Sequence, residues 1–255
     1  MNELEREQTI KDYLEEHTFA SVKDLSQILD ASEATIRRDI SKLDEKGLVL
    51  KVFGGVAPAI ETKNDRIAKP FSENRVRNVE KKLAIAQKAA ELCEDGDTII
   101  VHGGTTAYML AQEIVSKHLK VITNSMPVAS LLWRESKIHL VVPGGELHRE
   151  PELFLGRVDG SKNYYASKSF IGAQAFGVRG IMETNPVLIE GMRHFLDCSD
   201  QIIVICDSSK FDLNARVVSC PIDRITKLIT DSGITDVMKN ALNEMGVEVI
   251  ISCDP

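Results

Sequence analysis

The chain has 255 residues, 43% of them hydrophobic, which is enough for a small domain plus one full α/β domain and too many for a disordered protein. Its 31 basic and 38 acidic residues give a net charge of −7, so nucleic-acid binding would need a locally basic face. The five cysteines form no CxxC pair and no apolar run approaches the ~20 residues of a membrane span, so we expect a cytoplasmic protein with no metal site, no cofactor and no membrane partner.

Three helical segments are expected near the N-terminus. The first carries an apolar side made of Ile10, Tyr13 and Leu14. The second follows a capping-box-like start at Ser21 and carries an apolar stripe made of Val22, Leu25, Ile28 and Leu29. Only residues 30 and 31 separate it from the third segment, and two short helices joined by so tight a turn predict a helix-turn-helix.

The third helix is predicted to begin at an N-cap, Ser32, and to bury a stripe made of Ile36, Ile40 and Leu43. The face opposite that stripe is basic and partly small: Ala34, Thr35, Arg37, Arg38, Ser41 and Lys42 lie there, with Glu33, Asp39 and Asp44 toward its flanks. An arginine pair on an isolated helix is more typical of a solvated face. Here the preceding turn fixes its direction, so we expect this face to approach the major groove of DNA.

A β-wing and a linker are expected next. Gly47 ends the helix, and residues 48–53 alternate like a strand before the Gly54-Gly55 turn, which predicts a short two-stranded wing. The following polar stretch lacks periodicity, and we expect it to be a solvated spacer more than a phosphate contact. The predicted boundaries are a winged helix-turn-helix over 1–58, a linker over 59–78 and an α/β domain over 79–255.

The rest of the chain alternates between helical and strand patterns. Strands are predicted near 98–101, 120–123, 138–142, 169–172, 202–206, 226–230 and 248–251, and helices near 79–92, 107–115, 128–134, 186–196 and 235–245. Short buried strands separated by helices predict a mostly parallel sheet with helices on both faces.

Polar and glycine-rich turns follow several of these strands. In such a sheet, ligand sites lie at the carboxyl ends of the strands. The turn after the first strand places glycines and hydroxyls at the start of a helix, where an anion such as phosphate is favoured, although a purely structural turn is an equal alternative. The strand-end residues that we assign to an effector site are His102, Gly103, Gly104, Thr105, Thr106, Asn124, Ser125, Gly144, Gly145, Asp207 and Lys210. A small phosphorylated polyol would suit them all.

The stretch SEATIRRDISKLDEKGLVLKVFGG resembles the recognition helix and wing of the DeoR family of bacterial transcriptional regulators. The segments GGTT, ITNSMPVA, VVPGGEL, FIGA and IIVICDSSKF resemble that family's sensor domain, which is similar to the ribose-5-phosphate isomerase and CoA-transferase folds. The resemblance covers nearly the whole chain. It implies that Ser32, Thr35, Arg37, Arg38 and Lys42 bind operator DNA, and that the α/β domain binds a sugar phosphate or a related metabolite.

Three positions depart from the family pattern. Phe53 replaces a histidine of the wing, so we expect base reading to rest on the helix. His102 replaces an acid before the GGTT turn, and Gln174-Ala175 replace an Asp-Gly pair, so a carboxylate expected near the ligand is missing. A lone histidine at a strand end is more often structural, and its neighbours favour a ligand contact only slightly.

Two functions follow from these patterns. The first is a transcriptional regulator, expected to repress a carbohydrate-utilisation operon as a dimer or tetramer and to leave DNA when a phosphorylated sugar binds. The second is a sugar-phosphate isomerase or transferase with an accessory N-terminal module. We favour the regulator and expect no catalytic residue, because acid–base chemistry needs a tuned base or an acid pair and the sequence offers no close pair of acids.

Overall fold

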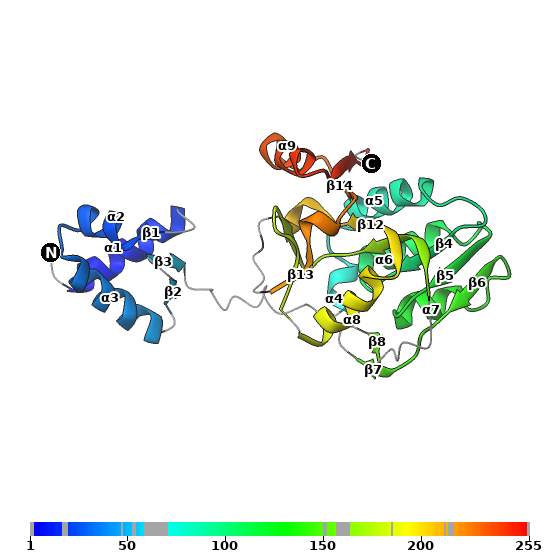
Figure 1. The fold of residues 1–255 in the computed structure, drawn as a ribbon, viewed down its shortest axis with the longest axis horizontal. Helices are drawn as coiled ribbons and strands as arrows, with labels where there is room; N and C mark the ends of the chain where they lie inside the picture. The colour runs from blue at the N-terminus through cyan, green and yellow to red at the C-terminus, as the bar shows by residue number, and fades with distance from the viewer. Residues whose placement is uncertain are drawn as a thin grey trace. The chain divides into compact units, whose positions relative to one another are not determined.

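The computed structural model describes residues 3–16, 20–46, 48–52, 55–58, 71–149, 152–156, 164–184, 186–211, 213 and 217–253. The chain forms two compact units, residues 1–64 and 65–255 (Figure 1). Several stretches lie outside the described residues, among them Gly47, Phe53, Gly54, residues 157–163 and most of the predicted linker, residues 59–70. Each unit is described by itself below.

The first unit is a winged helix-turn-helix. Its described elements are α1 (Glu3–Glu16), β1 (Ala20–Ser21), α2 (Val22–Ile28), α3 (Glu33–Glu45), β2 (Val49–Val52) and β3 (Gly55–Pro58). The predicted two-stranded wing is present as the antiparallel pair β2–β3, and β1 adds a third strand beside β3. The two residues of β1 are too few to show a strand pattern in the sequence.

Both predicted N-caps of this unit are present. Ser21 Oγ accepts a hydrogen bond from the Asp24 N–H (3.0 Å) at the start of α2. Ser32 Oγ accepts one from the Thr35 N–H (3.2 Å) at the start of α3. Each cap satisfies a backbone donor that the first turn of a helix leaves unpaired, so the two serines define where the helices begin.

The apolar stripes of α2 and α3 meet in one core, with one exception. Ile28 is 48% exposed, so its predicted burial is wrong. At 100° per residue it lies about 90° from the centre of the stripe that the other apolar residues of α2 form, which carries its side chain out of the core. The remaining predicted core residues of this unit are buried or packed against the core.

Asp39 is buried on the core side of α3. The sequence placed it toward a flank of the outward face. Its side chain is 2% exposed and is paired with Arg6 of α1, whose Nε donates to Asp39 Oδ2 at 2.7 Å and whose Nη2 donates to Oδ1 at 3.3 Å. A buried carboxylate needs such a partner, because losing its water without one is costly. The pair therefore fixes α1 against the recognition helix.

The second unit contains the remaining elements. Those before its middle are α4 (Phe71–Arg75), α5 (Val79–Glu91), β4 (Thr98–Val101), α6 (Thr105–Glu113), β5 (Leu119–Ile122), α7 (Met126–Leu132), β6 (Ile138–Val141), β7 (Glu146–His148) and β8 (Leu153–Leu155). Those that follow are β9 (Ala166–Ile171), β10 (Ala175–Gly177), β11 (Gly180–Glu183), α8 (Pro186–Leu196), β12 (Ser199–Ile205), β13 (Val217–Pro221), β14 (Lys227–Thr230), α9 (Asp236–Glu244) and β15 (Glu248–Ile251).

Seven of these strands form one parallel sheet in the order β15-β14-β12-β9-β4-β5-β6, which confirms the predicted fold class. The chain builds outward from β4 in one direction through β5 and β6. It then returns to the other side of β4 and builds outward through β9, β12, β14 and β15. The strand order thus reverses between β4 and β9, and such a switch point is where parallel sheets bind ligands.

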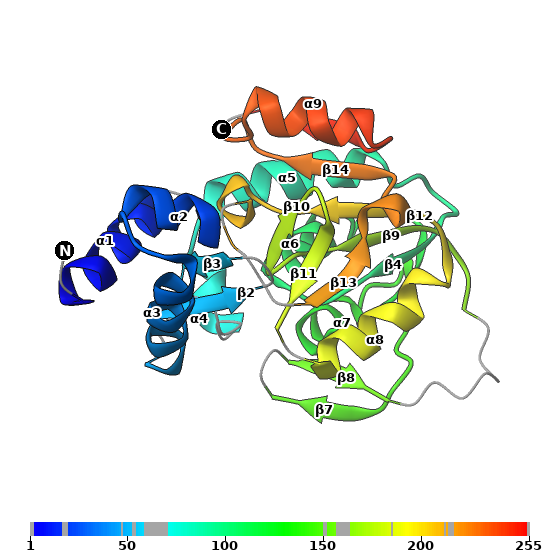
Figure 2. The same cartoon turned by 60° about the vertical axis from the view of Figure 1, so that its left-hand side comes forward.

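Helices cover both faces of this sheet. Alternate residues of β12 show the division: Ile203 and Ile205 pack in the core with α5, α6 and α7, whereas Ile202 and Val204 pack in the core with α8 and α9. Crossovers between parallel strands are right-handed, so a sheet that reverses direction places its helices on opposite faces. Figure 2 shows α8 in front of the sheet and α5 and α6 behind it.

Two features of the second unit were not predicted. The antiparallel sheet β10-β11-β13 packs beside α8, and β7 pairs with β8. In addition, residues 71–78 belong to the second unit, because Phe71 of α4 packs edge-on against Tyr108 of α6 with ring centroids 5.8 Å apart. The predicted linker therefore extends too far, since its polar composition hides this one aromatic anchor.

We expect Asp39→Asn to destabilise the first unit by about 2 kcal/mol, because it leaves the nearly buried guanidinium of Arg6 without its charged partner. The measurement is chemical denaturation followed by circular dichroism. Glu33→Gln is the matched control: Glu33 pairs with Arg37 at 3.3 Å on an exposed surface, and its loss should cost less than about 0.5 kcal/mol. Equal effects of the two substitutions would contradict the structural role of the Arg6–Asp39 pair.

Candidate functional site

The outward face of α3 is a candidate surface for DNA. Arg37 and Arg38 are exposed, and Lys42 and Thr35 are half-buried at its edges. The carboxylate of Glu33 holds Arg37 at 3.3 Å, but this exposed pair is weak and can be exchanged for a phosphate or a base. The face therefore presents the basic side chains that the sequence placed there.

The hydroxyls at the start of α3 are already engaged. Ser32 Oγ caps the helix and lies 2.9 Å from Thr35 Oγ1, so these two side chains shape the helix N-terminus as well as facing outward. Farther along, the wing contributes a cation: Lys51 Nζ on β2 donates to Ser41 Oγ on α3 at 3.0 Å. Lys51 thus extends the basic face from the helix onto the wing.

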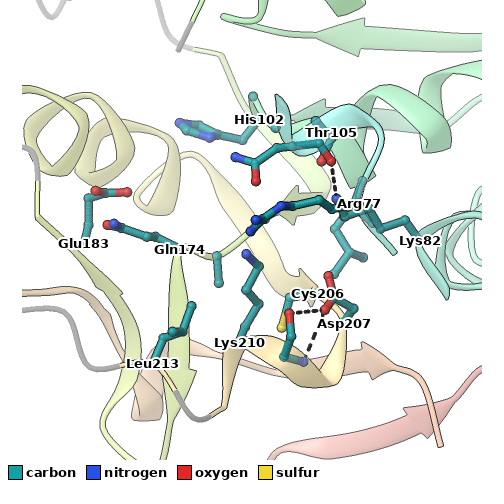
Figure 3. Close-up of a pocket in the computed structure, with 18 of the residues that line it drawn as sticks. Arg77, Lys82, His102, Thr105, Gln174, Glu183, Cys206, Asp207, Lys210 and Leu213 are labelled. Atoms are coloured by element: carbon teal, nitrogen blue, oxygen red, sulfur yellow. Dashed lines mark hydrogen bonds between the residues drawn. The ribbon is translucent and has the colours of Figure 1, made fainter. Parts of the chain in front are cut away.

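A cavity of about 300 Å³ lies in the second unit at the carboxyl ends of β4, β9 and β12, where the strand order reverses. The predicted effector residues that line it are His102, Gly103, Gly104, Thr105, Thr106, Asp207 and Lys210. Pocket residues that the sequence did not assign include Asn74, Arg77, Lys82, Gln174, Glu183 and Ser209. Figure 3 shows how these side chains surround the cavity.

One wall of the pocket is the N-terminus of α6. Gly104 is the N-cap with φ +125°, a conformation that favours glycine, and it offers no side chain to cap the helix. A Cβ on Gly103 would lie 2.0 Å from Leu153 Cδ2, so this glycine is needed for close packing. The helix start therefore faces the pocket with backbone N–H groups and the positive end of its dipole, which favours an anion.

Three cationic side chains line the same pocket: Arg77, Lys82 and Lys210. Lys82 of α5 is 4% exposed, and its Nζ donates to the Asn74 carbonyl at 2.6 Å. Burial lowers the pKa of Lys82 to about 8, the Asp207 carboxylate opposes that shift, and Lys210 and Arg77 add to it. In Figure 3 Arg77 and Lys210 extend toward the same part of the cavity.

Asp207 holds the turn after β12. Its Oδ1 accepts hydrogen bonds from Asn78 Nδ2 (2.9 Å) and from the Ser209 N–H (3.2 Å) and is also bonded by the Ser209 hydroxyl. The predicted contact between Asp207 and a ligand hydroxyl therefore competes with bonds that Asp207 already makes. Its carboxylate positions the loop that carries Lys210.

The side of the pocket away from these cations carries an acid and an amide. Glu183 at the end of β11 is 7% exposed, and Gln174 follows β9. Gln174 Oε1 accepts bonds from the Thr184 N–H and hydroxyl, both at 3.1 Å, which fixes the orientation of the amide. Gln174 follows a parallel strand, and ligand sites lie at the carboxyl ends of such strands, so its position in the sequence could have indicated a pocket residue. Lys82 and Arg77 do not follow a strand, and no sequence pattern indicated that they line the pocket.

His102 is a neutral side chain of the pocket wall. It is 5% exposed, and burial lowers its pKa to about 4, so the imidazole is uncharged at physiological pH. Asn124 Nδ2 lies 3.4 Å from His102 Nε2, and Asn124 Oδ1 has no hydrogen-bond partner among the residues that the structure describes. Asn124 is thus next to a residue of the pocket wall but does not itself line the pocket.

The remaining predicted effector residues do not line this pocket. Ser125 is buried and caps α7, with its Oγ accepting from the Val128 N–H at 3.4 Å, and it forms a bridge with Leu153 of the pocket wall. Gly144 and Gly145 form a turn with positive φ, and Gly145 packs tightly against Gly156. Ser125 follows β5 and the two glycines follow β6, on the opposite side of β4 from β9.

No three His, Cys, Asp or Glu side chains among the described residues are placed to hold a metal ion. None of the helices that the described residues form is both long and apolar enough to cross a membrane.

Both units match known families. Residues 6–62 match the DeoR-like helix-turn-helix domain, and residues 77–232 match the DeoR C-terminal sensor domain. A regulator named YulB from Bacillus subtilis is 33% identical over 96% of this chain and 95% of its own length. UlaR from Shigella dysenteriae, also named an HTH-type transcriptional regulator, is 28% identical over 98% of this chain and 99% of its own length.

Two solved structures match 51% and 60% of the chain. Ribose-5-phosphate isomerase A from Methanocaldococcus jannaschii covers 51% of this chain and 53% of its own, with 19% identity and a TM-score of 0.39. Translation initiation factor eIF-2B from Pyrococcus horikoshii covers 60% and 62%, with 18% identity and a TM-score of 0.42.

Both relatives are named transcriptional regulators and match this chain over nearly their whole length, which confirms the expectation of a regulator. The helix-turn-helix and the sensor domain match separately and in the same order as the two units of the structure. This chain therefore belongs to the DeoR family and is a DNA-binding transcriptional regulator.

Proposed function

We propose that this regulator represses a carbohydrate-utilisation operon and leaves its operator when a phosphorylated sugar occupies the pocket in the second unit. The observation that carries the proposal is the polarity of that pocket. Arg77, Lys82, Lys210 and the start of α6 supply positive charge, whereas Glu183 and Gln174 supply a carboxylate and an amide elsewhere on the wall. A ligand with a phosphate at one end and hydroxyls at the other matches both.

A phosphate suits the cationic part of the pocket for a physical reason. The ammonium groups of Lys82 and Lys210 and the guanidinium of Arg77 repel one another, and a dianion would reverse that repulsion while accepting their hydrogen bonds. Glu183 disfavours a second anionic group nearby and accepts hydrogen bonds from hydroxyls. The proposed effector is therefore a monophosphate with an uncharged polyol.

The DNA surface that we propose is the outward face of α3 together with Lys51 of the wing. Arg37 and Arg38 can reach guanine edges or phosphates, and Ser32, Thr35 and Lys42 border them. The chain has a net charge of −7, so this one basic face supports only modest affinity. Specific binding is therefore proposed to require paired half-sites and a homo-oligomer, either a dimer or a tetramer.

Arg38→Ala is expected to weaken binding to the DNA upstream of the regulator's own gene by roughly tenfold to a hundredfold, because it removes a contact of about 1–3 kcal/mol. Fluorescence anisotropy at physiological salt measures the change. Arg193→Ala, which removes an exposed arginine of α8 in the other unit, is the matched control and should leave the affinity unchanged. If the unaltered protein shows no preference for this DNA over random duplex, the proposed operator binding is wrong.

A thermal-shift panel of sugars and their phosphates should raise the melting temperature only for phosphorylated members, and the best of these should release the protein from operator DNA. Lys210→Met should weaken that ligand by roughly tenfold or more, because it removes one charge-assisted contact to phosphate. Equal shifts from a sugar and its own phosphate would argue against an anion site in this pocket.

The affinity for the sugar phosphate should fall as the pH rises through about 8, the pKa of Lys82. Burial makes Lys82 lose its proton at a pH where an ordinary lysine keeps it, and only the protonated form attracts an anion. A sugar phosphate is a monoester that stays a dianion above its second pKa of about 6, so the loss from pH 7 to pH 9 should reach about tenfold. Calorimetry at both pH values measures it. In Lys82→Met the same change of pH should alter the affinity much less.

A further inference from the structure

The pocket shares residues with the segment that leads to the linker. Residues 71–78, which we call the strap, comprise α4 and the turn that follows it, and both Asn74 and Arg77 of the strap line the pocket. Residues 59–70, which connect the strap to the first unit, lie outside the described residues. Whatever fixes the strap therefore fixes the point at which the chain leaves the second unit.

Contacts at each end hold the strap on the second unit. At its beginning, Phe71 and Arg75 share Tyr108 of α6: the Phe71 ring is edge-on to it and Arg75 Cζ lies 5.3 Å from its centroid. At its end, Asn78 Nδ2 donates to Asp207 Oδ1 at 2.9 Å and to Ser209 Oγ at 3.3 Å. Asn78 has φ +48°, a conformation that non-glycine residues adopt at a cost.

A pocket cation bonds to the backbone of the strap. The Nζ of Lys82, which is almost fully buried, donates to the Asn74 carbonyl at 2.6 Å. An ammonium has three N–H donors, so the same Nζ can hold Asn74 and an anion together. Lys82 can therefore donate hydrogen bonds to the strap and to a bound anion at the same time.

The cations around the pocket come from different elements. Arg77 is carried by the strap itself, whereas Lys82 and Lys210 lie on α5 and on the loop after β12. Lys210 and Arg77 disfavour the charged form of the buried Lys82, and an anion among the three cations would attract each of them. A bound anion must therefore favour the arrangement in which Arg77 stays against the pocket.

We propose that an anion bound at the start of α6 fixes the strap through Arg77 and Lys82, so that occupancy of the pocket is passed to the linker through residues 71–78. The inference rests on the anion site of the proposed function and adds the element that responds to it. A ligand shifts a conformational equilibrium only if it binds one state better than the other. Here the difference lies in Arg77, which the strap carries to the pocket, and in Lys82, whose ammonium can bond the anion and the Asn74 carbonyl of the strap together.

Hydrogen exchange of the full-length protein with and without saturating inorganic phosphate tests this proposal. Amides of residues 71–78 should exchange on the order of tenfold more slowly with phosphate, which matches the usual size of coupling between linked sites. Amides of α9, which carries no pocket residue, provide the internal reference and should not change. Chloride at equal ionic strength replaces phosphate in the unliganded sample.

Three variants separate coupling from binding, each compared at its own saturating phosphate concentration. Lys82→Met should abolish the protection of the strap, and Lys82→Arg should restore part of it. Lys210→Met should weaken phosphate binding but retain the protection once saturated, because Lys210 does not contact the strap through a backbone bond. Lys88→Met, an exposed position farther along α5, should behave as the unaltered protein.

The outcomes distinguish this inference from the proposed function. Saturable phosphate binding without slower exchange in residues 71–78, or protection that survives in Lys82→Met, would overturn the role of the strap and leave the effector site intact. Failure of phosphate to bind at all would overturn the anion site and the strap mechanism together.

Discussion

The reversal of strand order between β4 and β9 is the constraint on which the pocket of the second unit depends. Parallel strands end at the same edge of a sheet, and the loops of two neighbours normally turn the same way. Where the order reverses, the loop after β4 and the loop after β9 diverge and leave a space between them. The start of α6, the turn after β9 and the loop after β12 all border that space, although they are far apart in sequence.

The same pocket brings three cations together, one of them buried. Burial makes the charged form of Lys82 costly, and its neighbours Lys210 and Arg77 add to that cost. The Asp207 carboxylate offsets part of this cost and organises the loop that carries Lys210.

The first unit depends on polar contacts to orient α3. This helix must expose its arginines and still be fixed against a small core. The Ser32 cap defines the start of α3, the buried ion pair of Arg6 and Asp39 holds the helix to α1, and Lys51 of the wing meets Ser41. A small domain buries little apolar surface, so polar contacts of this kind set the orientation of a helix as much as the core does.

The sequence by itself determined the helix-turn-helix, its two serine caps, the basic face of α3, the seven strands of the parallel sheet and the anion-favouring turn before α6. All of these follow from local periodicity, capping and turn chemistry, which act over a few residues. Only the tertiary structure decided that Asp39 is buried, that Lys82 and Arg77 line the pocket, and that Gly144, Gly145 and Ser125 do not. Those outcomes depend on strand order and on which helix packs across which strand end, and neither is encoded within a short stretch of chain.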